Sequence, residues 1–192
     1  MLIVHPHGLV DAAIPETIEA MAADRIRALR ALRPQGPYVL GGHCNGALVA
    51  FEMARQLLQS GEHVPAVFMI EAREPSDGAA EDTSTAGDAY VTFDGAGLPR
   101  VLVPGDRLSD AQLRYSRAMD RYAGGACATH VVTVRSRAHD HVGRDPGWTG
   151  LAASAETHVL PGDHRTLITN HVGELARVVR AALDRRLERA PS

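Results

Sequence analysis

Hydrophobic positions along the chain predict helices and strands in alternation. Apolar residues recur at three- and four-residue steps in some segments, as in amphipathic helices, and form short, nearly continuous runs in others, as in buried strands. The helices are expected at about residues 15–32, 47–58, 110–122 and 172–187. The strands are expected at about residues 38–40, 64–70, 129–134 and 156–160. This order predicts an α/β fold, a mostly parallel sheet with helices on both faces.

Residues 73–108 interrupt this alternation. Asp, Gly, Ser, Thr and Pro are frequent there and no hydrophobic period is sustained, so we expect a lid or flexible insertion. Ser109 is the expected N-cap of the helix that follows. With 192 residues, the whole chain (1–192) fits one domain, since a single core grows to about 250 residues.

Composition excludes several classes of protein. A hydrophobic content of 45% and a net charge of −3 are typical of a globular protein, and no basic face for nucleic acid is indicated. The apolar runs are much shorter than the roughly 20 residues that cross a bilayer, so no membrane partner is expected. Two cysteines, Cys44 and Cys127, are too few for a disulfide framework, which favours a reducing, cytoplasmic location. Cys127 is expected to be a small buried hydrophobe.

One cysteine lies in a pattern that carries chemistry. In the segment Gly42 to Gly46 the thiol of Cys44 stands between a strand and a helix, as in a nucleophile elbow with Cys in place of Ser. Glycines two positions to either side are expected to let the neighbouring chain segments approach closely. The helix N-terminus favours a thiolate and an oxyanion, and the N–H of Asn45 is the expected first oxyanion donor.

A cysteine nucleophile needs a base and an acid further along the chain, each after a strand. His164 follows the strand that ends at Leu160, and we expect it to be the base. Two residues compete for the acid. Glu71 ends an uninterrupted apolar strand, where a carboxylate is costly unless a partner uses it, and Asp140 follows the next major strand. We favour Glu71. The poorer candidates for the base are His43, His139 and His171.

Four segments together point to a known family: 17–24, 36–42, 50–54 and 161–164. They resemble the thioesterase domains that end nonribosomal peptide and polyketide synthetases, within the α/β-hydrolase superfamily. The resemblance implies that Cys44 is the nucleophile, that His164 is the base and that Glu71 stands at the acid position. It also implies a small-molecule acyl substrate carried on the 4′-phosphopantetheine arm of an acyl or peptidyl carrier protein, and no cofactor of the enzyme's own.

Three departures from that family matter. Cys replaces its usual Ser, Glu replaces its usual Asp, and the beginning is short. The family's first strands, and the His-Pro-Gly-rich loop that donates a second oxyanion amide, precede the part that matches here. Residues 2–8 superficially resemble that loop. Either the chain is a fragment or truncation that lacks half of the oxyanion hole, or this segment has taken over the role.

Three hypotheses about function follow. In the first, an acyl or peptidyl group passes from the carrier to Cys44 and is released by cyclisation, by transfer to an amine or hydroxyl, or by hydrolysis. In the second, a free-standing editing thioesterase hydrolyses stalled acyl groups. In the third, a non-catalytic module only docks carrier proteins. A metal site is not expected, because the cluster of His139, Asp140 and His141 is more typical of a solvated loop.

Overall fold

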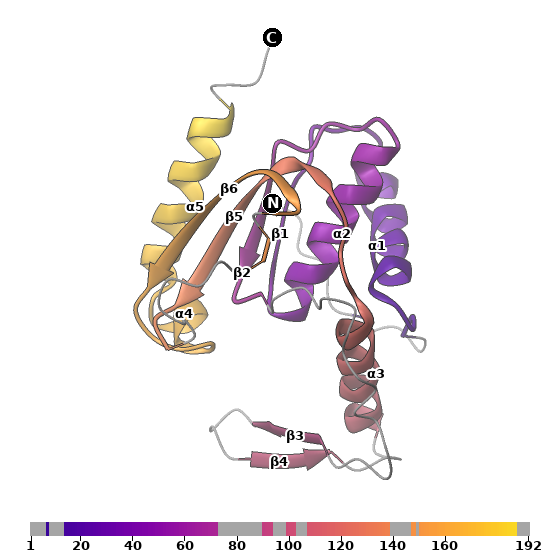
Figure 1. Cartoon of the computed structure of the whole chain (residues 1–192), viewed down its shortest axis with the longest axis vertical. Coiled ribbons are helices and arrows are strands. Elements are labelled where there is room, and N and C mark those ends of the chain that lie inside the picture. Colours follow the sequence, from indigo (N-terminus) through magenta and orange to yellow (C-terminus); the bar gives the residue numbers. More distant parts are fainter. Residues whose placement is uncertain are drawn as a thin grey trace.

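The computed structural model (Figure 1) describes residues 7, 14–72, 90–93, 99–102, 107–138, 147–148 and 150–187. Four strands, all in parallel pairs, form the main sheet in the order β1-β2-β5-β6. They are β1 (Val39–His43), β2 (Ala66–Ile70), β5 (Cys127–Ser136) and β6 (Ala152–Leu160). The predicted α/β class and the predicted alternation are confirmed.

Strand register brings the carboxyl ends of the strands together. Ile70, the last residue of β2, pairs with His43 of β1 and with Val134 of β5, and Ser136 of β5 pairs with Leu160 of β6. Residues that directly follow these strands therefore gather along one edge of the sheet, where open α/β sheets place their sites.

Helices cover both faces of the main sheet, α1 (Ile18–Leu32) and α2 (Asn45–Gln59) on one side and α4 (Thr166–Thr169) and α5 (Val172–Leu187) on the other (Figure 1). A further helix, α3 (Arg107–Arg121), lies beyond the end of the sheet and contacts α2. The buried side chains form two clusters. One contains Val67 of β2 and Phe51 of α2, and the other contains Phe68 of β2 and Leu175 of α5. Because successive strand residues point to opposite faces, β2 contributes to both clusters and is buried on both sides.

Helix boundaries differ from the sequence prediction in three places. α1 begins at Ile18, because the hydroxyl of Thr17 accepts a hydrogen bond from the N–H of Ala20 at 3.1 Å and caps the helix there. Ser109 is not an N-cap, since α3 already begins at Arg107; hydrophobic periodicity marks the buried face of a helix and not its first turn. The single turn of α4 was missed because it is too short to show a period.

The buried face of α5 also differs from the expectation. The apolar period of this segment predicts that Val172 and Ala176 are buried, but both are exposed, Val172 by 54%. Leu175 and Ala182 provide the buried contacts instead. Val172 is the first residue of the helix, and its side chain lies in solvent.

Part of the insertion at 73–108 forms a second, two-stranded sheet. β3 (Tyr90–Phe93) pairs in antiparallel fashion with β4 (Pro99–Leu102). In Figure 1 this pair lies beyond α3, away from the main sheet, and β4 contacts α3. Strands of four residues are too short to show a sustained alternation, so the sequence analysis missed them. The role of this region as a lid stays a prediction.

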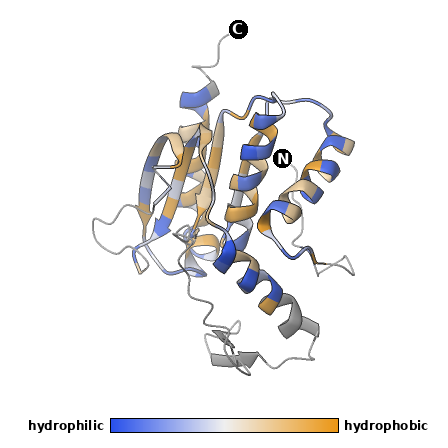
Figure 2. Ribbon diagram, turned by 45° about the vertical axis from the view of Figure 1, so that its right-hand side comes forward, coloured by the Kyte–Doolittle hydropathy of each residue, from blue (hydrophilic) through white to orange (hydrophobic). Residues whose placement is uncertain are grey.

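Hydropathy varies along each described helix (Figure 2). Both hydrophobic and hydrophilic residues are visible on α1 and α2, as expected for helices with one face in the core and one in water. None of the helices that the structure describes is long and apolar enough to pass through a membrane.

Candidate active site

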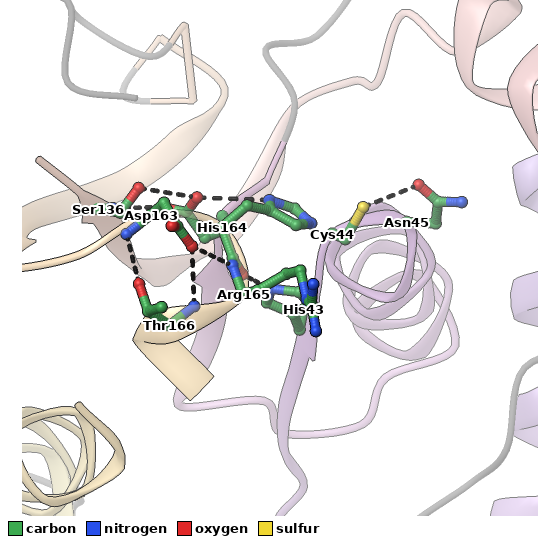
Figure 3. Close-up of polar contacts among 9 residues, drawn as sticks. His43, Cys44, Asn45, Ser136, Asp163, His164, Arg165 and Thr166 are labelled. Carbon is green, nitrogen blue, oxygen red and sulfur yellow. Dashed lines mark hydrogen bonds and ion pairs between the residues drawn. The ribbon is translucent and has the colours of Figure 1, made fainter. Parts of the chain in front are cut away.

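The residues selected as nucleophile, acid and base come to the same edge of the sheet. Cys44 directly follows β1, Glu71 directly follows β2, and His164 lies in the loop after β6. Figure 3 shows the imidazole of His164 beside Cys44, although the two are far apart in the sequence. Parallel strands that end together make this meeting possible.

The turn at Cys44 has the backbone geometry of a nucleophile elbow. Cys44 has φ 55° and ψ −124°, which L-residues rarely adopt. Its N–H donates to the carbonyl of Ile70 at 2.9 Å, which ties the turn to β2. Cys44 is also the residue that precedes α2, so its side chain lies at the positive end of a helix dipole.

The two elbow glycines differ in what they permit. A Cβ on Gly42 would lie 2.1 Å from the carbonyl oxygen of Gly46, so no side chain fits there. A Cβ on Gly46 would meet no described atom within 4 Å. The expectation that both positions need glycine for close approach is therefore right for Gly42 and wrong for Gly46, because only the carbonyl of Gly46 makes the approach.

Glu71 is buried in polar contacts that end on His164. It is 7% exposed, and its φ is 50°. Ser136, the last residue of β5, donates to it twice, from the backbone N–H to Oε1 and from the hydroxyl to Oε2 at 3.0 Å. Oε2 also lies 3.4 Å from Nδ1 of His164. Because Glu71 holds Nδ1, the other ring nitrogen, Nε2, is left for Cys44.

Electrostatics at His164 favour the protonated imidazole. A hydrogen bond with Cys44, followed by one with Glu71, raises the pKa of His164 to about 10, although partial burial acts in the opposite direction. The ring is 38% exposed, so solvent screens part of these interactions. The site therefore stabilises an imidazolium between Cys44 and Glu71.

His43 holds the loop that carries His164. Its Nε2–H donates to the carbonyl oxygen of His164 at 3.1 Å, and the two ring centroids are 4.5 Å apart. Burial lowers the pKa of His43, and the neighbouring His164 charge lowers it further, so this ring stays neutral at neutral pH. The structure thus places His43 as a support of His164, consistent with its low rank as a candidate base.

Hydrogen bonds within the loop from Asp163 to Thr166 also stabilise its conformation. The carboxylate of Asp163 accepts hydrogen bonds from the N–H groups of Arg165 and Thr166, both at 2.9 Å. The hydroxyl of Thr166 accepts one from the N–H of Asp163 at 2.7 Å. Gly162 has φ 97°, where a side chain would be strained, and a Cβ there would lie 2.5 Å from the Thr166 hydroxyl. These contacts fix the backbone from which His164 projects.

Asn45, the predicted oxyanion donor, is the first residue of α2. Its backbone N–H is among the first of the helix, which have no partner within the helix itself and point toward incoming anions. Its side chain contacts Cys44 directly, with Oδ1 3.2 Å from Sγ.

The remaining sequence predictions have mixed outcomes. Cys127 is buried, as expected, and burial raises the pKa of its thiol to about 11. Asp140, the alternative acid, and the whole His139 to His141 cluster lie outside the described residues. Within the described part of the chain, no three His, Cys, Asp or Glu side chains form a group suited to a metal ion.

One residue of the segment 2–8 is described. His7 is buried, and its Nε2 lies 2.8 Å from Oδ2 of Asp24 on α1. This contact ties His7 to α1. A contribution of residues 2–8 to the oxyanion hole stays a prediction.

Sequence reasoning missed Ser136 and the support given by His43. Ser136 could have been predicted, because it is a polar residue at the carboxyl end of a buried strand. The same criterion selected Glu71. The contact between His43 and the carbonyl of His164 could not have been predicted, since it joins residues 121 positions apart.

Comparison with known proteins agrees with this arrangement. A parallel sheet, an elbow after a strand and a histidine in the loop after a later strand define an α/β-hydrolase type of fold. Residues 2–183 match the family model "Thioesterase domain". The chain belongs to the thioesterase domain family.

Related proteins are much longer than this chain. Chondramide synthase of Chondromyces crocatus is 28% identical over 191 residues, which cover 74% of this chain and 5% of the synthase. Indigoidine synthase of Streptomyces lavendulae is 45% identical over 97 residues, which cover 47% of this chain and 8% of the synthase. The chain therefore spans a small part of each of these relatives.

Solved structures share the fold. The thioesterase domain of NocB from the nocardicin cluster superposes with a TM-score of 0.70 at 22% identity, over 95% of this chain and 80% of that domain. The thioesterase domain SrfTE, described for cyclization of surfactin, gives 0.61 at 16% identity, over 93% of this chain and 79% of that one. At these identities the likeness concerns the fold.

Proposed function

We propose that this chain takes an acyl or peptidyl group from the phosphopantetheine thioester of a carrier protein onto Cys44 and then releases it. The observation that carries the proposal is the meeting of an elbow cysteine, an imidazole and a buried carboxylate at one sheet edge, with Nδ1 of His164 3.4 Å from Glu71. Membership in the thioesterase domain family supports it. The relatives include synthases, which supports a carrier protein as partner.

The first step forms an ion pair. The hydrogen bond with Cys44 is the largest cause of the raised pKa of His164, so the site favours an imidazolium beside this sulfur. His164 takes the proton of Cys44 through Nε2, and the thiolate that remains is the nucleophile.

In the first half-reaction the Cys44 thiolate attacks the thioester carbonyl carbon. The carbonyl π electrons move to oxygen, and the N–H of Asn45 donates to this oxyanion. The intermediate then collapses, the bond to the phosphopantetheine sulfur breaks, and His164 gives its Nε2 proton to that sulfur. The products are acyl-Cys44 and the free thiol of the carrier.

In the second half-reaction His164, now neutral, takes the proton of an incoming amine, hydroxyl or water that attacks acyl-Cys44. The bond to Sγ breaks, the acyl product leaves, and the thiolate–imidazolium pair is restored. Because a thioester was exchanged for a thioester, the acyl group keeps its activation, which an oxygen ester of serine would partly lose. We therefore expect an amine or hydroxyl to capture the acyl group at least as readily as water.

Glu71 orients the base throughout. It accepts from Nδ1–H of His164 and is itself held by Ser136, so the imidazole keeps Nε2 toward the sulfur. His43 and the Asp163 turn hold the backbone of the same histidine. The arrangement combines one reactive pair with several groups that only position it.

Intact-mass measurement tests the acyl-enzyme. Mixing the chain with an acyl-loaded carrier is expected to add one acyl mass to the wild type and none to Cys44→Ala. Cys127→Ala is the matched control and should acylate normally, because Cys127 is buried. An equal adduct on Cys44→Ala would contradict the nucleophile, and no adduct or turnover on any variant would favour a carrier-docking module.

Product analysis tests the mode of release. An acyl chain that carries its own amine or hydroxyl is expected to give a cyclic product as well as free acid. Free acid as the only product would contradict the transfer step, and a strong preference for short acyl groups would favour an editing thioesterase.

A further inference from the structure

The side chain of Asn45 contacts the sulfur of Cys44. The distance between Sγ and the amide oxygen Oδ1 is 3.2 Å, with the thiol as donor (Figure 3). Asn45 thus offers two groups near the nucleophile: a backbone N–H at the start of α2 and a side-chain amide on the sulfur itself. The proposed function uses only the first.

The direction of this hydrogen bond depends on the charge of the sulfur. A neutral thiol has a proton to donate to Oδ1, whereas a thiolate has none and accepts. A terminal amide serves both cases, because a half-turn about its last bond exchanges Oδ1 for the donor Nδ2 at nearly the same position. With a thiolate at this site, an oxygen at 3.2 Å repels and an amide N–H attracts.

The groups around the sulfur make the second orientation the relevant one. His164, from the loop after β6, is a titratable side chain that hydrogen-bonds to the sulfur. The ring of His43, from the end of β1, packs against His164, and Oε2 of Glu71, just after β2, lies 3.4 Å from Nδ1 of His164. Figure 3 shows His164 and Asn45 on opposite sides of Cys44. The sulfur therefore has a cation on one side and an amide, with no charge of its own, on the other.

We propose that the side-chain amide of Asn45 is a catalytic group that donates Nδ2–H to the Cys44 thiolate. The proposal rests on the proposed function, in which Cys44 is the nucleophile. The hydrogen bond stabilises the thiolate that forms when His164 takes the proton of Cys44. It strengthens again in the second half-reaction, as the electron pair of the breaking acyl–sulfur bond returns to Sγ.

Alkylation by iodoacetamide tests this donor apart from acyl transfer. The reagent reacts with the thiolate of Cys44, and this reaction needs no carrier, no acyl group and no oxyanion hole. Rates are measured against pH on the full chain, by mass spectrometry of the peptide that contains Cys44. The buried Cys127 in the same digest should stay unmodified and reports that the protein is folded.

Three variants separate the roles of the amide. Asn45→Ala removes the side-chain donor and keeps the backbone N–H. Asn45→Asp keeps the shape and replaces the donor with a charged acceptor, and an acidic residue in the first turn favours the helix, so we expect it to fold. Gln59→Glu adds the same charge at the far, exposed end of α2 and is the matched control.

The expected order of alkylation rates at pH 7 is wild type, then Asn45→Ala, then Asn45→Asp. We expect a loss of about threefold for Ala and about tenfold or more for Asp, with the midpoint of the pH profile about one unit higher in Asp, since one pH unit corresponds to a tenfold change. Gln59→Glu should match the wild type.

Two results would overturn the proposal: Asn45→Ala alkylated as fast as the wild type across the pH range, or faster. The second would mean that the amide stabilises the neutral thiol through Oδ1. Either result leaves the acyl-adduct experiment on Cys44→Ala unaffected, and a failed acyl-adduct experiment leaves the alkylation order readable, so the two failures are distinguishable.

Discussion

Two buried carboxylates in this chain have very different surroundings. Glu52 on α2 is 0% exposed and accepts from Arg55 through both oxygens, at 2.7 and 2.8 Å, and also from Gln56 and from the hydroxyl of Tyr122. Glu71 is 7% exposed and accepts from Ser136 and His164. Each is well satisfied, as a buried carboxylate must be.

The difference lies in the cation. Arg55 keeps its charge at every ordinary pH, and its hydrogen bonds with Glu52 raise its pKa further. The imidazole of His164 is titratable, and its other neighbour is the thiol of Cys44. A buried carboxylate with a permanent cation has a structural role and here also binds Tyr122, just after α3, whereas one with a titratable cation can serve a reaction that moves a proton.

The largest expected effect is on activity, from Glu71→Gln. An amide in place of the carboxylate keeps much of the contact with Ser136 and loses the charge that holds His164. We expect acyl release to fall about 10²- to 10³-fold, less than in a serine triad because Cys44 also pairs with the imidazole. Steady-state kinetics with a loaded carrier give the rate, and urea unfolding should show a small loss of stability. Unchanged turnover would remove Glu71 from the mechanism.

Glu52→Gln is expected to show the opposite pattern. It leaves Arg55 without its carboxylate and Tyr122 with a weaker acceptor, so the free energy of unfolding should fall by about 2 to 4 kcal/mol. At urea concentrations below the unfolding midpoint of the variant, alkylation of Cys44 should proceed at the wild-type rate. Glu16→Gln, an exposed position before α1, is the control and should change neither quantity. A large loss of Cys44 reactivity in folded Glu52→Gln would contradict the purely structural role of Glu52.

Raising the pH should weaken the contact of Glu71 with His164 and leave the contact of Glu52 with Arg55 in place, without any mutation. The pKa of His164 is raised from about 6.5 to about 10, so its contribution to stability is complete below pH 6.5 and is lost as the pH rises through 10. The pair of Glu52 and Arg55 persists over that range. An NMR titration should find the His164 imidazole protonated well above pH 7 in the wild type and at lower pH in Cys44→Ala. Equal midpoints in the two proteins would contradict the ion pair.

The smallest effects are expected from two single hydroxyl groups. Tyr122→Phe removes one donor to Glu52 and should cost about 1 kcal/mol of stability with no change in turnover. Ser136→Ala removes one donor to Glu71 and keeps the backbone N–H, so turnover should fall about three- to tenfold with a similar small loss of stability. If Tyr122→Phe lowered turnover and Ser136→Ala did not, the roles given to Glu52 and Glu71 would be reversed.

Local patterns in the sequence were sufficient for the parts of the site that depend on strand ends. Cys44, Glu71 and His164 each stand after an apolar run, and apolar runs form the strands of a buried parallel sheet whatever their partners are. The same reasoning preferred Glu71 as acid, because a carboxylate at the end of a buried strand needs a partner, and the structure places His164 beside it.

Contacts between distant segments were beyond local patterns. Val172 and Ala176 follow the apolar period of α5 and yet are exposed, since the docking angle of the helix on the sheet decides which side chains are covered. The short strands β3 and β4 carry too few residues for a period to stand out.

The sequence by itself determined the α/β class, the tight turn at Cys44 and the positions of Glu71 and His164 after apolar strands, because each follows from interactions over a few neighbouring residues. Only the tertiary structure decided that Ser136 holds Glu71 and that His43 holds His164, because these hydrogen bonds join segments 65 and 121 positions apart. Their partners are chosen by the register of the strands and by the packing of the loops, and neither is written in a local pattern.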